Sequence, residues 1–421
     1  MPLEIAIIGG GLAGSTLATA LLPHAHLNIS IFESAPEFSE RGAAVGIATN
    51  GQNALKEIGG GGGVLGGVIE RAGGVVMGSS RVCLASGPNA MDVLVDLAGE
   101  QRGRVMHRAA LLAELLRPID EEKKFTNKKV TKIDDDANHS GKVTIHFDDN
   151  TTFQADAVIG ADGVRGYVRR HILGPDHPAL NARPAGFWDC RALMPFAKAK
   201  EILGEEYFEV NRQYGWIGNG GFFMHDVLDG GETVQCILSE VEEWGEDEWT
   251  RPLDQAGLEK VVEKWSDTPL KGRIVQAMLQ NPDLKAYAQT HHAIDAPTYF
   301  KNRVCIMGDS AHASTPWQGS GAGQAIEDAM ILESLLAEVK DAIQIPAAFQ
   351  AYDQVRRPRT QRIVHSSHAT GLILSGVGEG GEGLDPEKIK NALPRRWGFI
   401  HGLDVKQHKN EAMEVFRKQL S

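Results

Sequence analysis

The chain has 421 residues, of which 42% are hydrophobic and 23% are charged, and its net charge is −12. This length predicts two domains that share an interface, and the acidic charge argues against nucleic acid or an anionic membrane surface as a partner. The four cysteines are widely scattered, so we expect buried thiols in a reducing compartment and no metal site.

The first predicted element is a short apolar strand at residues 3–8. No basic segment precedes it, which argues against a secretion signal, and no apolar run reaches the ~18 residues that span a membrane. We therefore expect a cytoplasmic protein. A helix at 12–22 and a second strand at 28–32 follow, and these three elements form a β-α-β unit.

Glycines in the first turn of this unit match the pattern G-x-G-x-x-G. Gly9 permits the tight turn, Gly11 lets the backbone approach a pyrophosphate, and Gly14 lets helix and strand pack closely. The pattern recurs at 61–66 and 378–383, but only the first copy follows a strand, opens a helix and has an acid at the end of the next strand. We predict a dinucleotide site that includes Gly9, Gly11, Leu12, Ala13, Gly14 and Glu33.

Further strands and helices are predicted on both sides of a stretch that has a different composition. Residues 181–240 are rich in aromatic and β-branched residues broken by Gly and Asn, which is typical of antiparallel sheet. The other expected elements are helices at 105–117, 253–265, 273–279, 321–339 and 405–419, strands at 142–147, 157–159 and 303–307, and a flexible loop at 371–383. We predict an α/β nucleotide-binding domain from 1–72, 101–172 and 290–370, a second domain from 73–100 and 173–289, and a C-terminal segment at 371–421.

Two further motifs identify the dinucleotide by resemblance. The segment Gly160-Ala161-Asp162-Gly163-Val164-Arg165 resembles the DG motif of class A flavoprotein monooxygenases, and Gly308-Asp309-Ser310 resembles the start of their GD motif. The continuation at 318–329 is especially similar to salicylate hydroxylases and related fungal phenol hydroxylases. The resemblance implies a Rossmann-type FAD-binding domain with an inserted, mainly antiparallel β-sheet and helices for the substrate, as in the p-hydroxybenzoate hydroxylase fold.

The same resemblance implies an FAD-dependent monooxygenase that uses NADH or NADPH and O2. In this family the reduced flavin forms a C4a-hydroperoxide, which transfers one oxygen atom to a small aromatic substrate such as a phenolic acid or a secondary metabolite. No second dinucleotide motif stands in a good context, as is usual in the family, so the choice between NADH and NADPH stays open. The choice between monomer and homodimer stays open as well.

The resemblance also assigns flavin contacts outside the first turn. Asp309 would accept hydrogen bonds from the ribityl chain, and the N-terminus of the helix at 321–339 would face the flavin ring. Arg108 begins a predicted helix, where a cation is favourable only with an anion nearby. The residues assigned in this way are Arg41, Ala44, Arg108, Asp162, Asp309, Gly321, Ala322 and Gly323.

Candidates for substrate contact lie in the predicted antiparallel sheet and after the GD motif. Arg191 stands among bulky apolar residues, where a charge needs an anionic partner or exposure to solvent. We predict Arg191, His225 and Asp226 as catalytic residues and Tyr214, Trp216, Pro316 and Trp317 as pocket residues. An internal ion pair for Arg191, a structural polar pair for His225 and Asp226, and core packing for Tyr214 and Trp216 are the open alternatives.

The chain departs from the family pattern at two of these positions. Salicylate hydroxylases commonly have a histidine where this chain has Trp317, and related enzymes often have a tyrosine where it has Asp226. The activation of a phenol must therefore differ here, which weakens salicylate itself as the substrate. The alternative functions are epoxidation or oxidative dearomatisation of an indole or polyketide, and a binding protein of the same fold that has lost catalysis.

Overall fold

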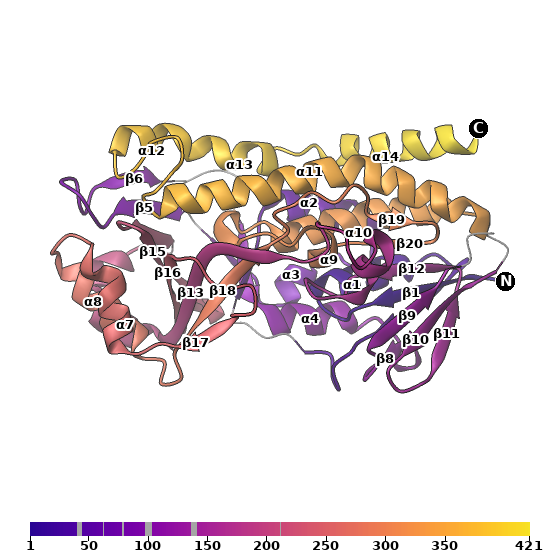
Figure 1. The fold of residues 1–421 in the computed structure, drawn as a ribbon, viewed down its shortest axis with the longest axis horizontal. Coiled ribbons are helices and arrows are strands. Elements are labelled where there is room, and N and C mark those ends of the chain that lie inside the picture. The colour runs from indigo at the N-terminus through magenta and orange to yellow at the C-terminus, as the bar shows by residue number, and fades with distance from the viewer. Residues whose placement is uncertain (40–43, 62, 78–79, 97–102, 136–140, 211) are drawn as a thin grey trace.

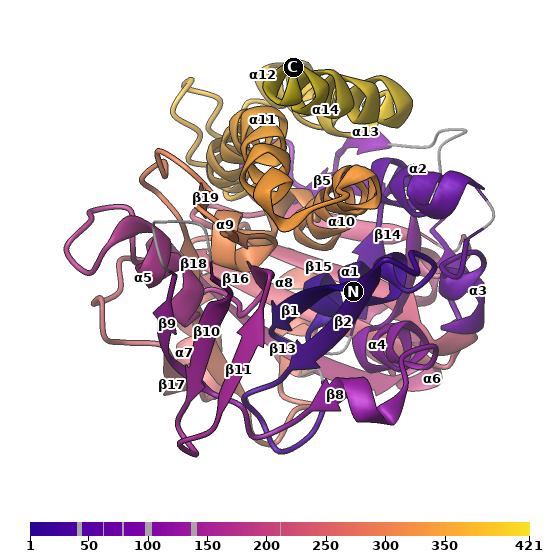
Figure 2. The same ribbon diagram turned by 90° about the vertical axis from the view of Figure 1, so that its right-hand side faces the viewer.

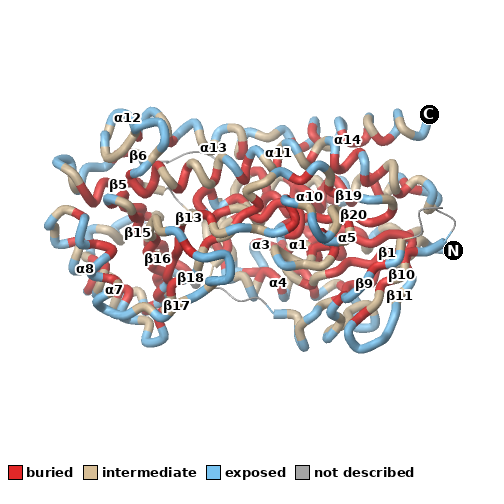
Figure 3. The backbone as a smooth tube through the Cα atoms, in the orientation of Figure 1, coloured by how far each residue is buried: buried red, intermediate tan, exposed pale blue. Residues whose placement is uncertain are grey.

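The computed structural model describes residues 1–39, 44–61, 63–77, 80–96, 103–135, 141–210 and 212–421. Figure 1 shows an elongated molecule in which two sheet regions follow one another along the long axis and helices run across one side. Both termini lie at the same end, as Figure 2 shows when that end is turned toward the viewer. Buried backbone is concentrated in the strands and in the helices packed between them (Figure 3).

One region is built on a largely parallel sheet, called the parallel sheet below, with the strand order β19-β20-β12-β1-β2-β8. Its strands are β1 (Leu3–Ile8), β2 (Leu27–Phe32), β8 (Lys124–Phe125), β12 (Ala157–Gly160), β19 (Phe300–Lys301) and β20 (Val304–Ile306). The central strands are apolar and buried, as strands covered on both faces are. The sheet therefore joins three segments that are distant in the sequence.

Helices cover this sheet and confirm two of the predicted elements. α1 (Leu12–Leu21) and α10 (Gly321–Glu338) pack against each other and share one hydrophobic core with β1, β2 and β12. The remaining helices of more than one turn in this region are α2 (Thr49–Glu57), α4 (Arg108–Leu116) and α5 (Tyr167–Leu173), and the short helices are α3 (Val68–Arg71) and α9 (Asp309–His312). The helix predicted at 105–117 starts later than expected because residues 104–107 form a strand.

Two small sheets flank the parallel sheet. One has the order β11-β10-β9 and the other the order β3-β7-β4. Their strands are β9 (Val130–Asp134), β10 (Val143–Phe147) and β11 (Thr152–Ala155), and β3 (Ala44–Ile47), β4 (Val75–Val76) and β7 (Arg104–His107). The strand predicted at 142–147 is confirmed as β10.

The other region is built on a sheet of eight strands, called the large sheet below, with the order β17-β18-β13-β16-β15-β14-β5-β6. Its strands are β5 (Ser80–Leu84), β6 (Val93–Asp96), β13 (Arg183–Pro195), β14 (Gln213–Ile217), β15 (Gly221–Leu228), β16 (Thr233–Val241), β17 (Thr250–Pro252) and β18 (Lys285–His291). All its pairings are antiparallel except that of β14 with β5. The antiparallel sheet predicted for 181–240 is confirmed.

The two faces of the large sheet pack against different partners. Successive side chains of a strand point to opposite faces. Phe187 and Phe222 point to the face that packs on Trp317 and on α11 (Ile345–Leu374), and we call this the inner face. Trp188 and Phe223 point to the outer face, which is covered by α6 (Phe196–Leu203), α7 (Gln255–Glu263) and α8 (Pro269–Met278).

The C-terminal part of the chain is more helical than predicted. α11 is 30 residues long and ends at Leu374, so it occupies the beginning of the loop expected at 371–383. Close packing explains one glycine of that stretch, since a Cβ at Gly371 would overlap the indole ring of Trp317. α12 (Pro386–Ala392) and α13 (Pro394–His401) follow, and α14 (Val405–Leu420) confirms the last predicted helix.

Cys83, Cys190, Cys236 and Cys305 are all buried and none forms a disulfide. Within the ranges given above, no helix is long and apolar enough to cross a membrane. The same ranges contain no group of three or more His, Cys, Asp or Glu side chains that could hold a metal ion.

A buried charged network joins α10 to α11. The Arg356 guanidinium donates to the carboxylates of Glu327 and Asp328, with a distance of 2.8 Å from Nε to the Asp328 Oδ1. Arg359 and Asn50 donate to Glu327 as well. Burial alone would raise the pKa of Glu327, but the two arginines outweigh it and lower that pKa to about 2. Both acids are therefore held ionised inside the helical core.

We expect Arg356→Met to destabilise the fold by about 3–5 kcal/mol, because it leaves two buried carboxylates without their main cation. The thermal unfolding midpoint measures this loss. Arg417→Met is the control, because Arg417 lies 4.0 Å from Glu338 in an exposed pair and should contribute less than about 1 kcal/mol. Equal effects of the two substitutions would contradict the importance of the network.

Candidate functional site

The first glycine turn is pressed against the DG segment. Gly9 has a φ of +108°, which only glycine adopts easily, and a Cβ there would overlap the carbonyl oxygen of Ala161. A Cβ at Gly14 would overlap the carbonyl oxygen of Gly9. Gly11 precedes α1 in an extended conformation, which leaves the first N–H groups of the helix facing outward from the turn. The turn can therefore bring its backbone close to a phosphate.

Glu33 stands at the end of β2, where the sequence predicted an acid that binds ribose. Its Oε2 accepts from the Gly10 N–H at 2.8 Å and its Oε1 accepts from the Ala35 N–H at 2.8 Å. Its Oε1 also accepts from the Ser34 hydroxyl at 3.1 Å, whereas Oε2 keeps a second lone pair that can accept from a ribose hydroxyl. Leu12 is buried at the start of α1, and Ala13 lies where α1 approaches the GD turn at Gly308.

Asp162 ties the DG segment to the GD segment. Its Oδ1 accepts from the Ser310 hydroxyl at 2.8 Å and its Oδ2 accepts from the Val168 N–H at 2.9 Å. Burial raises the pKa of the Asp162 carboxyl, and these hydrogen bonds oppose the rise. The first turn, the DG segment and the GD segment therefore meet at one place.

The GD turn presents Asp309 outward. Gly308 has a φ of +58° and donates its N–H to the Asp328 Oδ2 at 3.0 Å. Asp309 is the next residue, and its carboxylate is exposed and makes no side-chain hydrogen bond within the described ranges. α10 begins at Gly321, where a Cβ would meet nothing within 4 Å. A Cβ at Gly308 would lie 3.7 Å from that of Ala325, so the GD turn packs beside the N-terminal part of this 18-residue helix.

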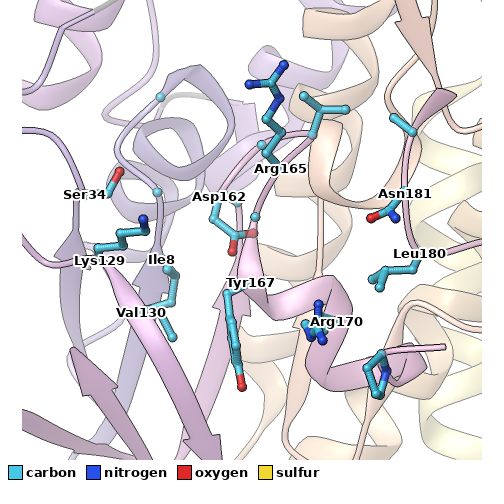
Figure 4. Close-up of a pocket in the computed structure, with 18 of the residues that line it drawn as sticks. Ile8, Ser34, Lys129, Val130, Asp162, Arg165, Tyr167, Arg170, Leu180 and Asn181 are labelled. Atoms are coloured by element: carbon cyan, nitrogen blue, oxygen red, sulfur yellow. The ribbon is translucent and has the colours of Figure 1, made fainter. Parts of the chain in front are cut away.

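A groove of about 950 Å³ runs past the first turn and the DG segment. Figure 4 shows Ser34, Lys129 and Val130 along one side of it and Leu180 and Asn181 along the other. Asp162, Arg165, Tyr167 and Arg170 lie between these two sides. The lining also includes Gly9, Gly11 and Glu33, so the groove follows the predicted dinucleotide site.

These residues fit FAD. The close backbone approach at Gly9, the acceptor Glu33 and the unbonded carboxylate of Asp309 match a diphosphate, a ribose and a polyhydroxyl chain in turn. The N-terminus of α10 offers N–H groups and a positive dipole end to a ring that becomes more negative on reduction.

The other predicted cofactor residues lie on different elements. Ala44 begins β3, which pairs with β7, and Arg108 begins α4 directly after β7 and is half-buried. Gly323 packs against Asn50 of α2, and Ala322 is half-buried beside it. Arg41 lies outside the described residues.

The structure separates the predicted substrate residues into two groups. His225 and Asp226 are neighbours on β15 and therefore point to opposite faces. Asp226 shares the inner face with Phe222, whereas the His225 ring lies among Tyr207, Phe208, Tyr214 and Phe223 on the outer side. Tyr214 and Trp216 belong to that same outer cluster. These three side chains pack as core, which was the open alternative for Tyr214 and Trp216, and do not share a pocket with Asp226.

On the inner face, Asp226 lies in a row of polar side chains. The Gln213 and Gln235 amides donate to its carboxylate at 3.4 Å each. Burial raises the pKa of Asp226 to about 6, against the opposing effect of these amides and of Arg191. Arg191 lies on the same face and its Nη2 is 3.4 Å from the Asp189 Oδ2. This pairing was the open alternative for Arg191.

Pro316 and Trp317 lie on the short helix η5 (Pro316–Gln318) after the GD turn. Trp317 is 9% exposed and packs on Phe187 and Phe222, with ring centroids 5.1 and 5.6 Å apart. Pro316 is exposed beside it. Trp317 thus links the GD turn to the inner face of the large sheet and helps to keep that junction dry.

Comparisons with known proteins agree with this geometry. Residues 234–367 match the family described as FAD binding domain. The chain is 33% identical over 98% of its length to a 6-methylsalicylate 1-monooxygenase of Aspergillus terreus, of which it covers 92%. It is 29% identical over 96% of its length to a salicylate hydroxylase of Pseudomonas putida, of which it covers 93%.

Solved structures show the same fold. A salicylate hydroxylase in complex with its substrate has a TM-score of 0.81 at 24% identity, with 98% of each chain covered. The structure of CtdE with FAD and a substrate has a TM-score of 0.81 at 19% identity over all of both chains. The fold and the family match define an FAD-dependent flavoprotein. The chain belongs to the FAD-dependent monooxygenases of the salicylate hydroxylase type, enzymes in which a reduced nicotinamide is the electron donor.

The sequence alone did not identify several residues that lie near the predicted site residues. Gln213 and Gln235 gain meaning only because the register of β14, β15 and β16 brings them beside Asp226. Asp328 lies in the segment 318–329, which is similar to salicylate hydroxylases. Its hydrogen bond from Gly308, however, depends on how α10 packs against the GD turn. Strand alternation was the available signal, since it already separates His225 from Asp226.

We expect Asp309→Ala to lose FAD at least about tenfold more readily, because hydrogen bonds to a carboxylate contribute about 1.5–3 kcal/mol. Flavin content per protein and the dissociation constant for added FAD measure the loss, and the thermal midpoint of the apoprotein should stay unchanged. Asp283→Ala is the control, since the Asp283 carboxylate is exposed and pairs with Lys285 on the surface. Normal flavin content in Asp309→Ala would show that this carboxylate does not hold the cofactor.

We expect His225→Phe to make the protein less sensitive to acid. Burial lowers the pKa of His225 from 6.5 to about 3, so the unfolded chain takes up a proton that the folded chain refuses. Stability at neutral pH is therefore lost as the pH falls from 6.5 toward 3, by about 2 kcal/mol between pH 7 and 5. Thermal unfolding at these two pH values measures the difference, with the exposed His365→Asn as the control. An unchanged acid sensitivity would place His225 in a wetter setting.

Proposed function

We propose that this enzyme inserts one oxygen atom from O2 into a small phenolic substrate bound on the inner face of the large sheet. The observation that carries the proposal is the buried Asp226 carboxylate, which faces the same side as the junction between Trp317 and the sheet. Bound FAD supplies the redox chemistry, taking a hydride from NADH or NADPH and activating O2. In balance, substrate, O2, NAD(P)H and a proton give hydroxylated substrate, NAD(P)⁺ and water.

The protein's own residues would hold the cofactor and its surroundings. Glu33 would accept from the ribose, Asp309 from the ribityl hydroxyls, and the N–H groups at Gly321 to Gly323 would face the flavin ring. Arg108 and Ala44 would flank the cofactor from the β3–β7 side, and Arg41 stays a predicted cofactor residue. The apolar contact of Phe187, Phe222 and Trp317 supports the exclusion of water from the reacting centre.

Asp226 would act on the substrate. A phenol donates more electron density to its ring when its hydroxyl loses a proton, and a carboxylate with a pKa of about 6 can accept that proton near neutral pH. The second oxygen of the carboxylate stays in contact with the Gln213 or Gln235 amide. Arg191, across the inner face, would balance the negative charge, while Trp317 has no group able to act as a base.

The reaction type can be tested directly. Flavin-loaded enzyme should consume NAD(P)H faster when a phenolic substrate is added, and the product should gain one oxygen atom by mass. A product that has lost its aromaticity or carries an epoxide would favour the alternative oxygenation. Protein that takes up no FAD would contradict the proposal altogether. The molecular mass of the purified enzyme in solution would distinguish a monomer from a homodimer.

We expect Asp226→Asn to lower kcat/KM by at least about a hundredfold, the usual contribution of a general base. In the wild-type enzyme kcat/KM should fall as the pH drops below about 6, because protonated Asp226 cannot accept the proton. The variant should lack this acidic limb. His225→Phe, the neighbour on the outer face, should keep both rate and limb, and an unaltered limb in Asp226→Asn would show that another group is the base.

A further inference from the structure

The inner face of the large sheet is unusually polar for a buried surface. Strand alternation from Phe187 and Phe222 places Asp189, Ser239, Asp226 and Gln235 on it, each with 7% exposure or less. On β18 the Ala286 and Ala288 side chains point outward, so Gln289 and His291, on the alternate positions that follow, point inward. Both are also at most 7% exposed, and the His291 ring stacks on His368 of α11 at 5.0 Å.

Several of these groups lack the hydrogen bonds that burial normally demands. The Gln235 Oε1, the Gln289 Oε1 and one ring nitrogen of His291 have no partner within the described ranges. Asp226 has two amide donors, both at the long distance of 3.4 Å. An unsatisfied buried polar group costs about 1–3 kcal/mol. Gln235 lies directly beside Asp226, whereas Gln289 and His291 lie near the other end of β13. A ligand that donates hydrogen bonds at Asp226 and Gln235 would remove the cost there.

The unsatisfied groups are mainly acceptors. The glutamine oxygens accept only, and an ionised carboxylate accepts only. A ligand that donates through hydroxyl or N–H groups complements such a face. A ligand that brings further acceptors leaves the same atoms unpaired, and a site built for donors rejects an analogue that lacks them.

The charged groups of the inner face also disfavour a ligand that carries a carboxylate. Asp189 and Asp226 provide two carboxyls, and within the described ranges Arg191 is the one cation that lowers the pKa of either of them. Arg191 is already 3.4 Å from Asp189, and its side chain is 42% exposed. A substrate carboxylate beside Asp226 would add a negative charge next to this carboxyl, and the described residues offer no further buried cation to pair with it.

From these observations we infer that the enzyme selects an uncharged aromatic substrate with at least two hydrogen-bond donors, of the dihydroxyarene class, over the corresponding hydroxybenzoate. The inference rests on the proposed function, because it assigns the substrate to the inner face. Asp226 and Gln235 are its specificity-determining residues. It departs from what the names of the two relatives above would suggest.

Matched pairs of ligands test this selectivity on flavin-loaded enzyme. Catechol against salicylate, and resorcinol against meta-hydroxybenzoate, each exchange one hydroxyl for a carboxylate. We expect the two diols to bind at least about tenfold more tightly, as measured by the change in the flavin spectrum on titration. They should also stimulate NAD(P)H consumption at lower concentration. Equal affinities, tighter binding of the carboxylates, or no binding of the diols would overturn the inference.

Variants on the two faces locate the selectivity. Asp226→Asn removes a negative charge and should shrink the diol preference severalfold, and Gln235→Leu should weaken both diols while leaving the two carboxylates unchanged. His225→Phe, next to Asp226 but on the outer face, should keep the wild-type preference. A preference untouched by Asp226→Asn and Gln235→Leu would overturn the assignment to the inner face.

The same data separate this inference from the proposed function. Hydroxylation of salicylate with no preference for catechol would refute the inference and leave a phenol hydroxylase. Binding of diols without any oxygenated product would refute the proposed function and leave the selectivity standing. A protein that cannot take up FAD would refute both.

Discussion

The buried carboxylate of Asp328 receives hydrogen bonds from three directions. The Gly308 N–H donates at 3.0 Å, the His312 ring lies at 2.6 Å, and the Arg356 Nε donates at 2.8 Å. Gly308 and His312 bracket Asp309, so one carboxylate on α10 fixes both ends of the turn that presents it. Burial opposes the charge of Asp328, but His312, Arg356 and the Gly308 N–H together hold its pKa below the usual value, so it stays ionised.

This turn also positions the other segments that would hold the cofactor. Ser310 donates to Asp162 and so positions the DG segment, while Gly9 lies against Ala161 of that segment. The three segments are separated by more than a hundred residues each, and no local preference could bring them together. Bringing them together lowers the conformational entropy of the chain, and the burial of apolar side chains in the helical core and the parallel sheet offsets this loss. A change far from the groove, on α11, can therefore alter how the groove holds its cofactor.

Local patterns predicted the elements whose signals are local. The β-α-β unit at the N-terminus and α10 follow from apolar periodicity and glycine spacing, and their observed bounds differ by about one residue. α11 was missed because its buried side chains include Asp353, Arg356 and Thr360, which pair with distant groups and leave no apolar stripe to read. The polar row around Asp226 depends on the register between strands, which no single strand specifies.

The two faces of one strand in the large sheet have different roles. On β15 the outward side chains Phe223 and His225 fill a core against helices, and the inward Phe222 and Asp226 border the proposed substrate site. A fold that needed only stability would make the inner face apolar as well, because replacing buried polar groups by well-packed apolar ones is often neutral or stabilising. The outer face is apolar, apart from His225 and a few others, and the inner face is not. The asymmetry therefore has its simplest physical cause in a ligand, whose own donors complete hydrogen bonds that the protein leaves open.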